Sequence, residues 1–196
     1  MTHMEYNKLH DIIIQKLRDE LPGHLSYHSV THVKDVIQAA ENIAQSEGIT
    51  GDVLTLIMTA ALFHDTGFIY GSKNHEERSC EIAASYLPDY GYSSEDIAKI
   101  QGMIMATKIP QSPQNHLEEI LADADLDYLG RDDFFVIGDK LYEELAMFGI
   151  VQTENDWNSL QEKFLKNHHY FTHTAIATRQ QKKDENLAII KQKLSQ

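Results

Sequence analysis

The chain has 196 residues, of which 42% are hydrophobic and 24% are charged, and its formal net charge is −13 at pH 7. This composition is that of a soluble globular protein large enough to bury one core, so we expect a single domain over residues 1–196. The negative charge excludes binding to a nucleic-acid polymer, which needs a basic surface, and it disfavours anionic membrane surfaces.

Three features of the chain bear on its location in the cell. No apolar run reaches the roughly 18–20 residues that span a bilayer, and the N-terminus lacks the basic and apolar regions of a secretory signal. The single Cys80 cannot form an internal disulfide, and we interpret it as a packed helix residue rather than a nucleophile. We therefore expect a cytoplasmic protein that does not bind membranes.

Apolar residues recur with the period of helices along the whole chain, and the alternation typical of strands is absent. Pro22-Gly23 ends the first helix, and Ser93-Ser94 provides an N-terminal cap for the fifth. The expected helices, in chain order, cover about residues 12–21, 30–48, 51–65, 74–87, 93–107, 116–129, 131–148, 154–169 and 173–194. Residues 66–71 and 109–113 carry glycines or prolines and are expected to be loops. The sequence therefore predicts an all-α fold.

The pair His64-Asp65 ends the most apolar stretch of the chain, residues 53–63. Both side chains are costly to bury unless they are paired or bind a metal. A polar pair at the end of a buried helix therefore indicates ligands that point into a dry pocket.

Two histidines, His28 and His32, lie four residues apart near the start of the second expected helix. This spacing places two side chains on one face of a helix. Taken alone the pair favours surface or capped histidines. It gains weight because His64-Asp65 ends the next helix, where a neighbouring antiparallel helix would bring the two groups together.

Three acids, Asp123, Asp125 and Asp127, alternate with apolar residues in the sixth expected helix. Alternate positions on a helix diverge by about 200°, so the three carboxylates cannot all face one metal ion. We expect one of them to be a ligand, while the others support it or face solvent.

Two imidazoles and two carboxylates form a mixed nitrogen and oxygen ligand set. Such a set suits Mn²⁺, Fe²⁺, Zn²⁺, Co²⁺ or Mg²⁺, and a carboxylate such as Asp65 can bridge two ions. A divalent ion can activate water as a nucleophile and stabilise the charge that develops on a phosphoryl oxygen. The expected cofactor is therefore one or two divalent metal ions.

These residues, in this order on a helical chain, resemble the HD superfamily of metal-dependent phosphohydrolases over roughly residues 24–130. Residues 27–36, Tyr-His-Ser-Val-Thr-His-Val-Lys-Asp-Val, are similar to a segment of cyclic-nucleotide phosphodiesterases and their bacterial relatives. Residues 61–65 are similar to the family's apolar helix that ends in His-Asp, and residues 122–126 to its terminal Asp element. The resemblance implies a helical bundle of the HD and phosphodiesterase type, with helices of about residues 131–196 packed on the motif-bearing core.

Matched residue by residue, the resemblance implies four metal ligands: His32, His64, Asp65 and Asp125. Asp125 is preferred to Asp123 because family members use the later acid. His28 matches the histidine that protonates the leaving oxygen in phosphodiesterases, a role that suits imidazole near neutral pH. The alternative for His28 is a helix-start residue bonded to the backbone. Asp65 is also expected to act in catalysis, by bridging a second ion or orienting the attacking water.

His75 falls where several relatives carry a histidine that binds a second ion, and it can equally contact substrate phosphate or cap the fourth helix. The fifth expected helix has no histidine where two-metal members carry one or two, which argues against a second ion held fully by the protein. We interpret His116 as a surface residue. Lys73, Lys108 and Arg131 are interpreted as solvated cations rather than phosphate ligands.

The C-terminal residues 164–172 and 183–187 resemble the corresponding part of a bacterial subgroup of HD phosphohydrolases. They contain the cluster His168-His169-Tyr170, which we interpret as packing on the core.

The sequence therefore predicts a hydrolase that uses metal-activated water on a phosphoester or phosphoanhydride of a small substrate, preferably a nucleotide. Phosphodiesterase, nucleotidase and nucleotide pyrophosphatase activities all stay open, because fold and ligands constrain the reaction class better than the substrate. Two other interpretations are a non-catalytic HD-fold binding or signalling domain and, with less support, a di-iron oxygenase. The missing histidine of the fifth helix weighs against the oxygenase.

Overall fold

The computed structural model describes residues 4–195, which form α-helices joined by loops and short 3₁₀ turns and contain no strand. The helices are α1 (Tyr6–Glu20), α2 (Val30–Ser46), α3 (Gly51–Phe63), α4 (His75–Tyr86), α5 (Ser94–Ala106), α6 (His116–Asp125), α7 (Phe134–Met147), α8 (Glu154–Asn167) and α9 (His173–Leu194). The 3₁₀ turns are η1 (Thr66–Tyr70), η2 (Leu87–Tyr90) and η3 (Asp127–Gly130). The predicted all-α class is confirmed.

The first helix begins at Tyr6, six residues before the expected start, and the other main differences from the expected elements lie at 3₁₀ turns. The loop expected over residues 66–71 is the turn η1, which ends at Gly71 with φ of 107°. The sixth expected helix is broken at Leu126, so that α6 ends at Asp125 and Asp127 begins η3. Because of this break, Asp127 does not share a helix with Asp123 and Asp125.

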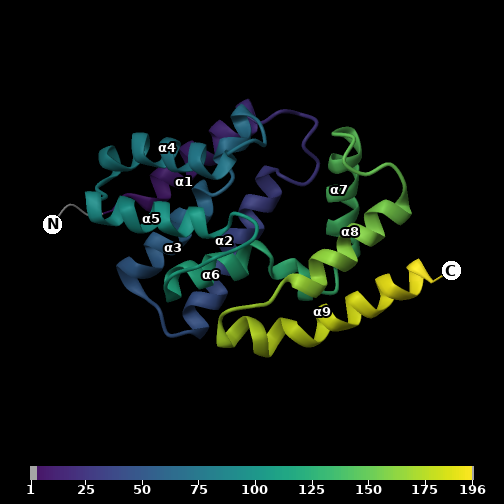
Figure 1. The fold of residues 1–196 in the computed structure, drawn as a ribbon. Helices are drawn as coiled ribbons and strands as arrows, with labels where there is room; N and C mark the ends of the chain where they lie inside the picture. The colour runs from purple at the N-terminus through teal and green to yellow at the C-terminus, as the bar shows by residue number, and fades with distance from the viewer. Residues whose placement is uncertain (1–3, 196) are drawn as a thin grey trace.

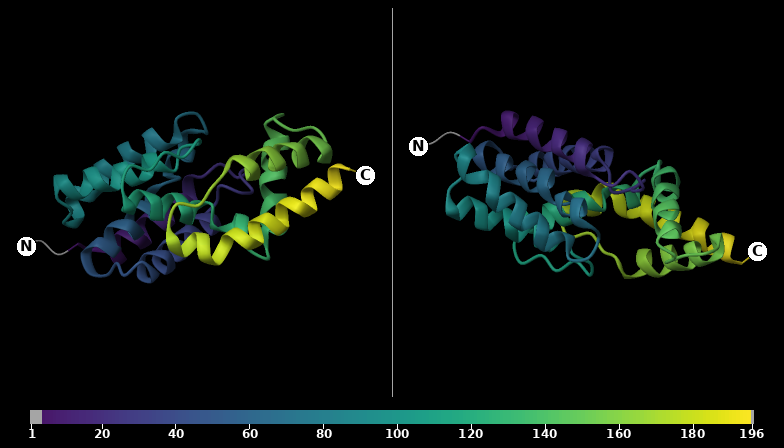
Figure 2. Two further views of the ribbon diagram at one scale, coloured as in Figure 1. Left: turned by 60° about the horizontal axis from the view of Figure 1, so that its bottom comes forward. Right: turned by 90° about the horizontal axis from the view of Figure 1, so that it is seen from above.

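Figure 1 shows α1–α6 grouped on one side of the molecule and α7–α9 on the other, with the two termini at opposite ends. The two further views in Figure 2 show the same division. Helix α3 lies in the core of the first group, because it is apolar around most of its circumference and a helix of that kind is buried. Its buried residues are Leu56, Ile57, Thr59, Ala60, Ala61, Leu62 and Phe63.

The apolar stretch that contains α3 is longer than the sequence analysis allowed. Residues Gly51–Tyr70 form a continuous 20-residue stretch with the length and composition of a membrane span, since η1 extends α3 almost directly. However, 67% of its most apolar window is buried inside the protein. This burial is that of a core helix.

Helices α7, α8 and α9 bury a second, smaller core against η3 and the segment that precedes α2. Its fully buried members are Tyr27, Leu126, Tyr128, Leu129, Phe134, Leu165 and Ile190. Tyr170 lies beside them, and its hydroxyl donates to the carbonyl oxygen of Leu126 at 3.3 Å. The second core therefore begins at Leu126, directly after Asp125, which places α7 and α8 next to the candidate ligands.

Asp123 joins α6 to the start of α9. The side chain is fully buried and accepts hydrogen bonds from the backbone N–H groups of Phe171 and Thr172 at 3.0 and 2.8 Å. The Thr172 hydroxyl donates a third bond at 2.7 Å, and the same hydroxyl accepts from the N–H of Ala175 in the first turn of α9. Asp123 is thus a structural acid that fixes the C-terminal helices on the core.

Replacing Asp123 with alanine is expected to destabilise the fold by about 3 kcal/mol or more, because three buried donors lose their acceptor. Urea unfolding at about pH 8 measures this loss, since burial raises the pKa of Asp123 to about 6 and the carboxyl is ionised there. The matched control is Asp132→Ala, whose side chain is 93% exposed and pairs with Lys182. Equal stabilities of the two variants would contradict the structural role of Asp123.

His168 is the second C-terminal residue with a defined structural environment. The ammonium group of the buried Lys183 donates to the His168 carbonyl oxygen at 2.7 Å and to Nδ1 at 3.2 Å. Burial, together with the positive charge of Lys183, lowers the pKa of His168 to about 3. The imidazole is therefore neutral in the folded protein.

The neutral His168 predicts a loss of stability in mild acid. Below about pH 6.5 the unfolded chain binds a proton at His168 while the folded chain does not, so stability falls as the pH falls towards 3. The free energy of unfolding changes through this one residue by at most about 1.4 kcal/mol per pH unit. The urea midpoint of wild type should drop more steeply between about pH 7.5 and pH 5 than that of His168→Gln. Parallel curves would show that His168 titrates normally in the folded state.

Candidate metal centre and active site

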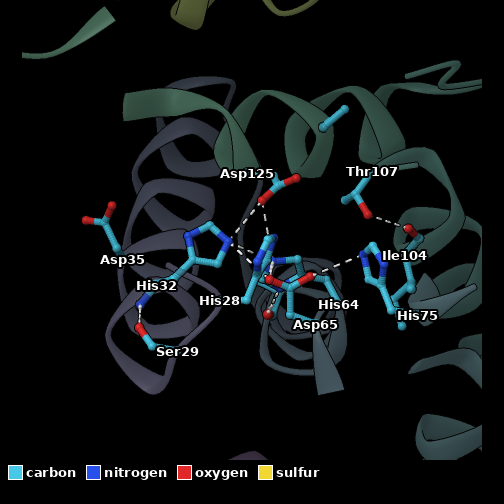
Figure 3. Close-up of polar contacts among 12 residues, drawn as sticks. His28, Ser29, His32, Asp35, His64, Asp65, His75, Ile104, Thr107 and Asp125 are labelled. Atoms are coloured by element: carbon cyan, nitrogen blue, oxygen red, sulfur yellow. Dashed lines mark hydrogen bonds and ion pairs between the residues drawn. The ribbon is translucent and has the colours of Figure 1, made fainter. Parts of the chain in front are cut away.

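Four side chains from three helix ends meet at one point, as Figure 3 shows. His32 lies in the first turn of α2, His64 and Asp65 directly follow α3, and Asp125 is the last residue of α6. Helices α2 and α3 are joined by only four residues, 47–50, so the start of α2 lies beside the end of α3. The hairpin therefore brings His32 to the His-Asp pair, as the sequence predicted.

The distances within the group are uniform. His32 Nε2 lies 3.2 Å from Asp125 Oδ1, 3.3 Å from Asp65 Oδ2 and 3.3 Å from His64 Nε2. His64 Nε2 lies 3.2 Å from Asp65 Oδ2 and 3.4 Å from Asp125 Oδ1. Ligands held about 2.1 Å from one metal ion are separated from their neighbours by about 3.0–3.4 Å in octahedral or tetrahedral geometry. Nitrogens of His32 and His64 and an oxygen of Asp125 therefore lie close enough together to hold one ion, all within 4.8 Å of one another, and Asp65 Oδ2 lies beside both nitrogens.

Two further observations fit a cation at this point. His64 Nδ1 donates to the carbonyl oxygen of Ala61 at 2.8 Å, which fixes the ring and leaves Nε2 as the free donor atom. Asp65 Oδ2 is buried and has no hydrogen-bond partner among residues 4–195, although both Nε2 atoms lie near it. The four side chains are at most 16% exposed, so the site is largely shielded from water.

The electrostatics of the four groups couple metal binding to proton release. Burial favours the neutral form of His32, but its contacts with Asp125 and Asp65 raise the pKa to about 9. Burial opposes ionisation of Asp125 in the same way, and the two histidines lower its pKa to about 2. Neutral imidazole is the form that binds a metal, so each histidine that becomes a ligand gives up a proton.

His28 is in the site, but not for the reason that its spacing suggested. It precedes Ser29, the N-cap residue of α2, and so lies outside the helix. Its ring stacks on Phe68 of η1 with centroids 3.9 Å apart, and it lies 6.1 Å from the ring of His32. The fixed turn before α2 and the contact with η1, rather than helical periodicity, bring His28 to the site.

Glu144 of α7 holds His28 in place. Its carboxylate accepts a hydrogen bond from His28 Nδ1 and further bonds from the backbone N–H groups of Tyr27 at 3.0 Å and His28 at 3.1 Å. Glu144 is only 1% exposed. Burial alone would raise its pKa, but the bonds from His28 and Tyr27 lower it below its usual value. The ionised carboxylate thus fixes the tautomer of His28 and leaves Nε2 as the ring nitrogen available to the cavity.

The sequence analysis missed Glu144. It follows another glutamate in an amphipathic helix, and the residue that it contacts lies 116 positions earlier in the chain. No local pattern distinguishes it from the exposed acids of the same helix.

His75 occupies the opposite side of Asp65. Its Nε2 lies 3.6 Å from Asp65 Oδ1, and its Nδ1 donates to the carbonyl oxygen of Ser72 at 3.1 Å. Phe68 lies between the two outer histidines, with its ring centroid 4.1 Å from that of His75. His75 therefore faces the carboxylate oxygen that points away from His32 and His64, as a contact for a second ion or a phosphate would.

The cations named from the sequence are all engaged elsewhere or exposed. Lys108 pairs with Glu77, and Arg131 pairs with Asp35 and Asp133. His116 is exposed and pairs with Glu119, in agreement with its interpretation as a surface residue. Lys73 is exposed.

A cavity of about 280 Å³ opens beside the ligand group. Its near end is lined by side chains of the site: His28, Asp65, His75, Glu76 and Asp125. Of the four-residue group, Asp65 and Asp125 thus face the cavity, with His28 and His75 beside them.

The HD domain family matches residues 29–127, which is half of the chain. A protein from an uncultured Thermotogales bacterium, described as a predicted HD superfamily hydrolase, shares the fold with a TM-score of 0.64 and 21% identity over 94% of this chain and 91% of its own. Bacillus subtilis YpgQ, solved in complex with ADP, has a TM-score of 0.68 and 18% identity over 96% of this chain and 95% of its own. Curated protein sequences contain no match to the chain.

Proposed function

The chain belongs to the HD domain family, and we propose that it is a metal-dependent phosphohydrolase that cleaves a phosphoester or phosphoanhydride of a nucleotide. The single observation that carries the proposal is that Asp65 and Asp125 each place a carboxylate oxygen 3.2–3.4 Å from the Nε2 atoms of both His32 and His64. This donor set lies at the end of a cavity large enough for a small ligand.

Each residue of the site has a role in the proposed reaction. The metal ligands are His32, His64, Asp65 and Asp125. A bound divalent ion activates water and withdraws charge from the phosphoryl group. In this role His28 acts as the imidazolium, which gives its Nε2 proton to the leaving oxygen while its Nδ1–H stays bonded to Glu144. Asp65, whose Oδ1 faces His75, orients the attacking water or reaches a second ion.

A nucleotide is the favoured substrate class for two reasons. The cavity combines the ligand group with a large apolar region, which suits a phosphate joined to a ring. YpgQ, which shares the fold, is solved with ADP. Phosphodiester, monoester and anhydride bonds all present the same reacting phosphoryl centre to the site.

The two alternative functions have less support. A di-iron oxygenase uses additional histidines, and α5, where two-metal relatives carry them, has none. A non-catalytic binding domain has no need of the four-residue donor set or of the bond between His28 and Glu144.

Turnover of a nucleotide panel at neutral pH with Mn²⁺ tests the proposal. The panel contains cyclic mononucleotides, nucleoside mono-, di- and triphosphates and an artificial phosphodiester, each run beside Asp65→Ala. Activity on one class that disappears in the variant supports the proposal and identifies the bond. A wild-type protein that binds Mn²⁺ but hydrolyses none of the panel would overturn it in favour of the binding domain.

A further inference from the structure

The cavity beside the ligand group continues away from it between α7 and α8, the helices at the right of Figure 1. This far end is lined by Leu126, Tyr128, Leu129, Phe134, Leu141, Leu145, Trp157, Leu160, Gln161, Phe164 and Leu165. Apart from the tips of Tyr128, Trp157 and Gln161, the surface is hydrocarbon. The total volume of about 280 Å³ is near the lower end of the roughly 300–1,000 Å³ typical of ligand sites. The cavity therefore takes one small molecule that spans both ends.

The charges of the cavity orient that molecule. No lysine or arginine lines it in the described part of the chain, so the far end has no group to neutralise a phosphate. A phosphate must lie at the metal end, beside His28 and His75. The organic part of the substrate then lies between α7 and α8.

Trp157 gives the far end a flat wall. The indole is 6% exposed and stacks on Tyr142 with ring centroids 6.1 Å apart and an interplanar angle of 25°. This contact fixes the indole while its surface lines the cavity. Phe164 supplies a second aromatic surface on the same helix, α8. Flat rings in the ligand suit such walls.

Gln161 is the unusual residue of the far end. The side chain is 7% exposed and is the only amide that lines the cavity within residues 4–195. Its Nε2 donates one long bond, 3.4 Å, to Asn158 Oδ1, while its Oε1 lies against Gly138 of α7 and accepts no hydrogen bond from a residue within 4–195. Polar side chains in apolar surroundings are normally bonded, and one long hydrogen bond uses little of the capacity of an amide. An under-used amide in an apolar cavity therefore indicates a partner in the ligand.

We propose that the far end binds the base of the nucleotide substrate, with Gln161 bonding to the edge of the base and Trp157 and Phe164 contacting its ring. A glutamine amide offers a donor and an acceptor side by side, the pattern with which it pairs to a base edge such as that of adenine. This inference rests on the proposed function and adds the residues that select the substrate.

Binding of nucleosides tests the location of the base without phosphoryl chemistry. Trp157 is the single tryptophan of the chain, so the tryptophan fluorescence comes from a residue that lines the far end. Titration of the Mn²⁺-loaded protein with adenosine, guanosine, cytidine and uridine should give a saturable change for at least one of them. Ribose, the control without a base, should give none. No change with any nucleoside, or the same change with ribose, would overturn the inference.

Two variants of Gln161 test its role in selection. Gln161→Leu removes both hydrogen-bonding groups, and Gln161→Glu keeps the shape but removes the donor. We expect the ratio of kcat/KM between the best and worst nucleotide base to shrink by roughly tenfold or more in Gln161→Leu and to change its order in Gln161→Glu. The control Gln38→Leu lies on an exposed position of α2 and should keep the wild-type ratio. If both Gln161 variants kept the wild-type ratio of kcat/KM between the bases, Gln161 would not select the base.

The two proposals fail separately. A protein that hydrolyses nucleotides but ignores the base in both Gln161 variants keeps the proposed function and loses this inference. A protein that hydrolyses no nucleotide, yet binds nucleosides at Trp157 in a manner that depends on Gln161, keeps the base site and loses the proposed reaction.

Discussion

Replacing His64 with alanine is expected to reduce kcat/KM by on the order of 1,000-fold or more, because the bound ion supplies several kcal/mol of charge stabilisation in such reactions. His64 is 1% exposed, and the bond from its Nδ1 to Ala61 aims Nε2 at the other three ligands. Loss of this nitrogen removes a quarter of the donor set. Affinity for Mn²⁺, measured by calorimetric titration, should fall together with activity.

The control for this variant is His116→Ala, since His116 is an exposed histidine of the same chain. Mn²⁺ should raise the melting temperature of wild type and of His116→Ala, because a ligand that binds only the folded state stabilises it. It should not raise that of His64→Ala. A His64→Ala protein with wild-type Mn²⁺ affinity and activity would place the metal elsewhere.

Replacing Glu144 with glutamine is expected to lower kcat by roughly 10- to 100-fold. This is less than the full rate enhancement of general acid catalysis, because His28 itself is kept. The glutamine fills the same volume and can still accept from the backbone N–H groups of Tyr27 and His28. It no longer supplies the buried negative charge that accepts from Nδ1 and orients the ring of His28. Glu144 is therefore a positioning residue that acts through His28.

A leaving-group series separates this role from a general loss of structure. A good leaving group such as 4-nitrophenolate departs without a proton, so Glu144→Gln and His28→Gln should cleave its esters at nearly the wild-type rate. Both variants should lose most on substrates with alkoxide leaving groups, and both should keep the wild-type affinity for Mn²⁺. An equal loss on every substrate would contradict proton delivery by His28.

The proximity of the four proposed ligands could be predicted from the sequence because most of their geometry is local. His64 and Asp65 are adjacent, and a four-residue connection between α2 and α3 is enough to place His32 beside them. Asp125 is the harder case, since Asp123 is two residues away and is more deeply buried. The choice between them depends on α9, whose first residues occupy the carboxylate of Asp123 and leave that of Asp125 for the site.

The partners of the ligand group lie too far away in the chain for a pattern to predict. Glu144 meets His28 only because α7 packs over the segment before α2, and Gln161 reaches the cavity only because α8 packs on α9 opposite α7. Both are single polar residues on amphipathic helices, where a buried acid or amide looks like an exposed one in the sequence. Their functions depend on tertiary packing, which the periodicity of their own helices does not specify.

The rate of nucleotide hydrolysis by wild-type protein, stripped of metal with EDTA and titrated with Mn²⁺, tests the central claim most directly. The donor spacing of 3.2–3.4 Å predicts no turnover in the stripped protein and a rate that rises with Mn²⁺ and saturates at one or two ions per chain. Asp65→Ala, titrated in parallel, should stay inactive throughout. A stripped protein that hydrolyses its substrate as fast as the Mn²⁺-loaded one would contradict the account.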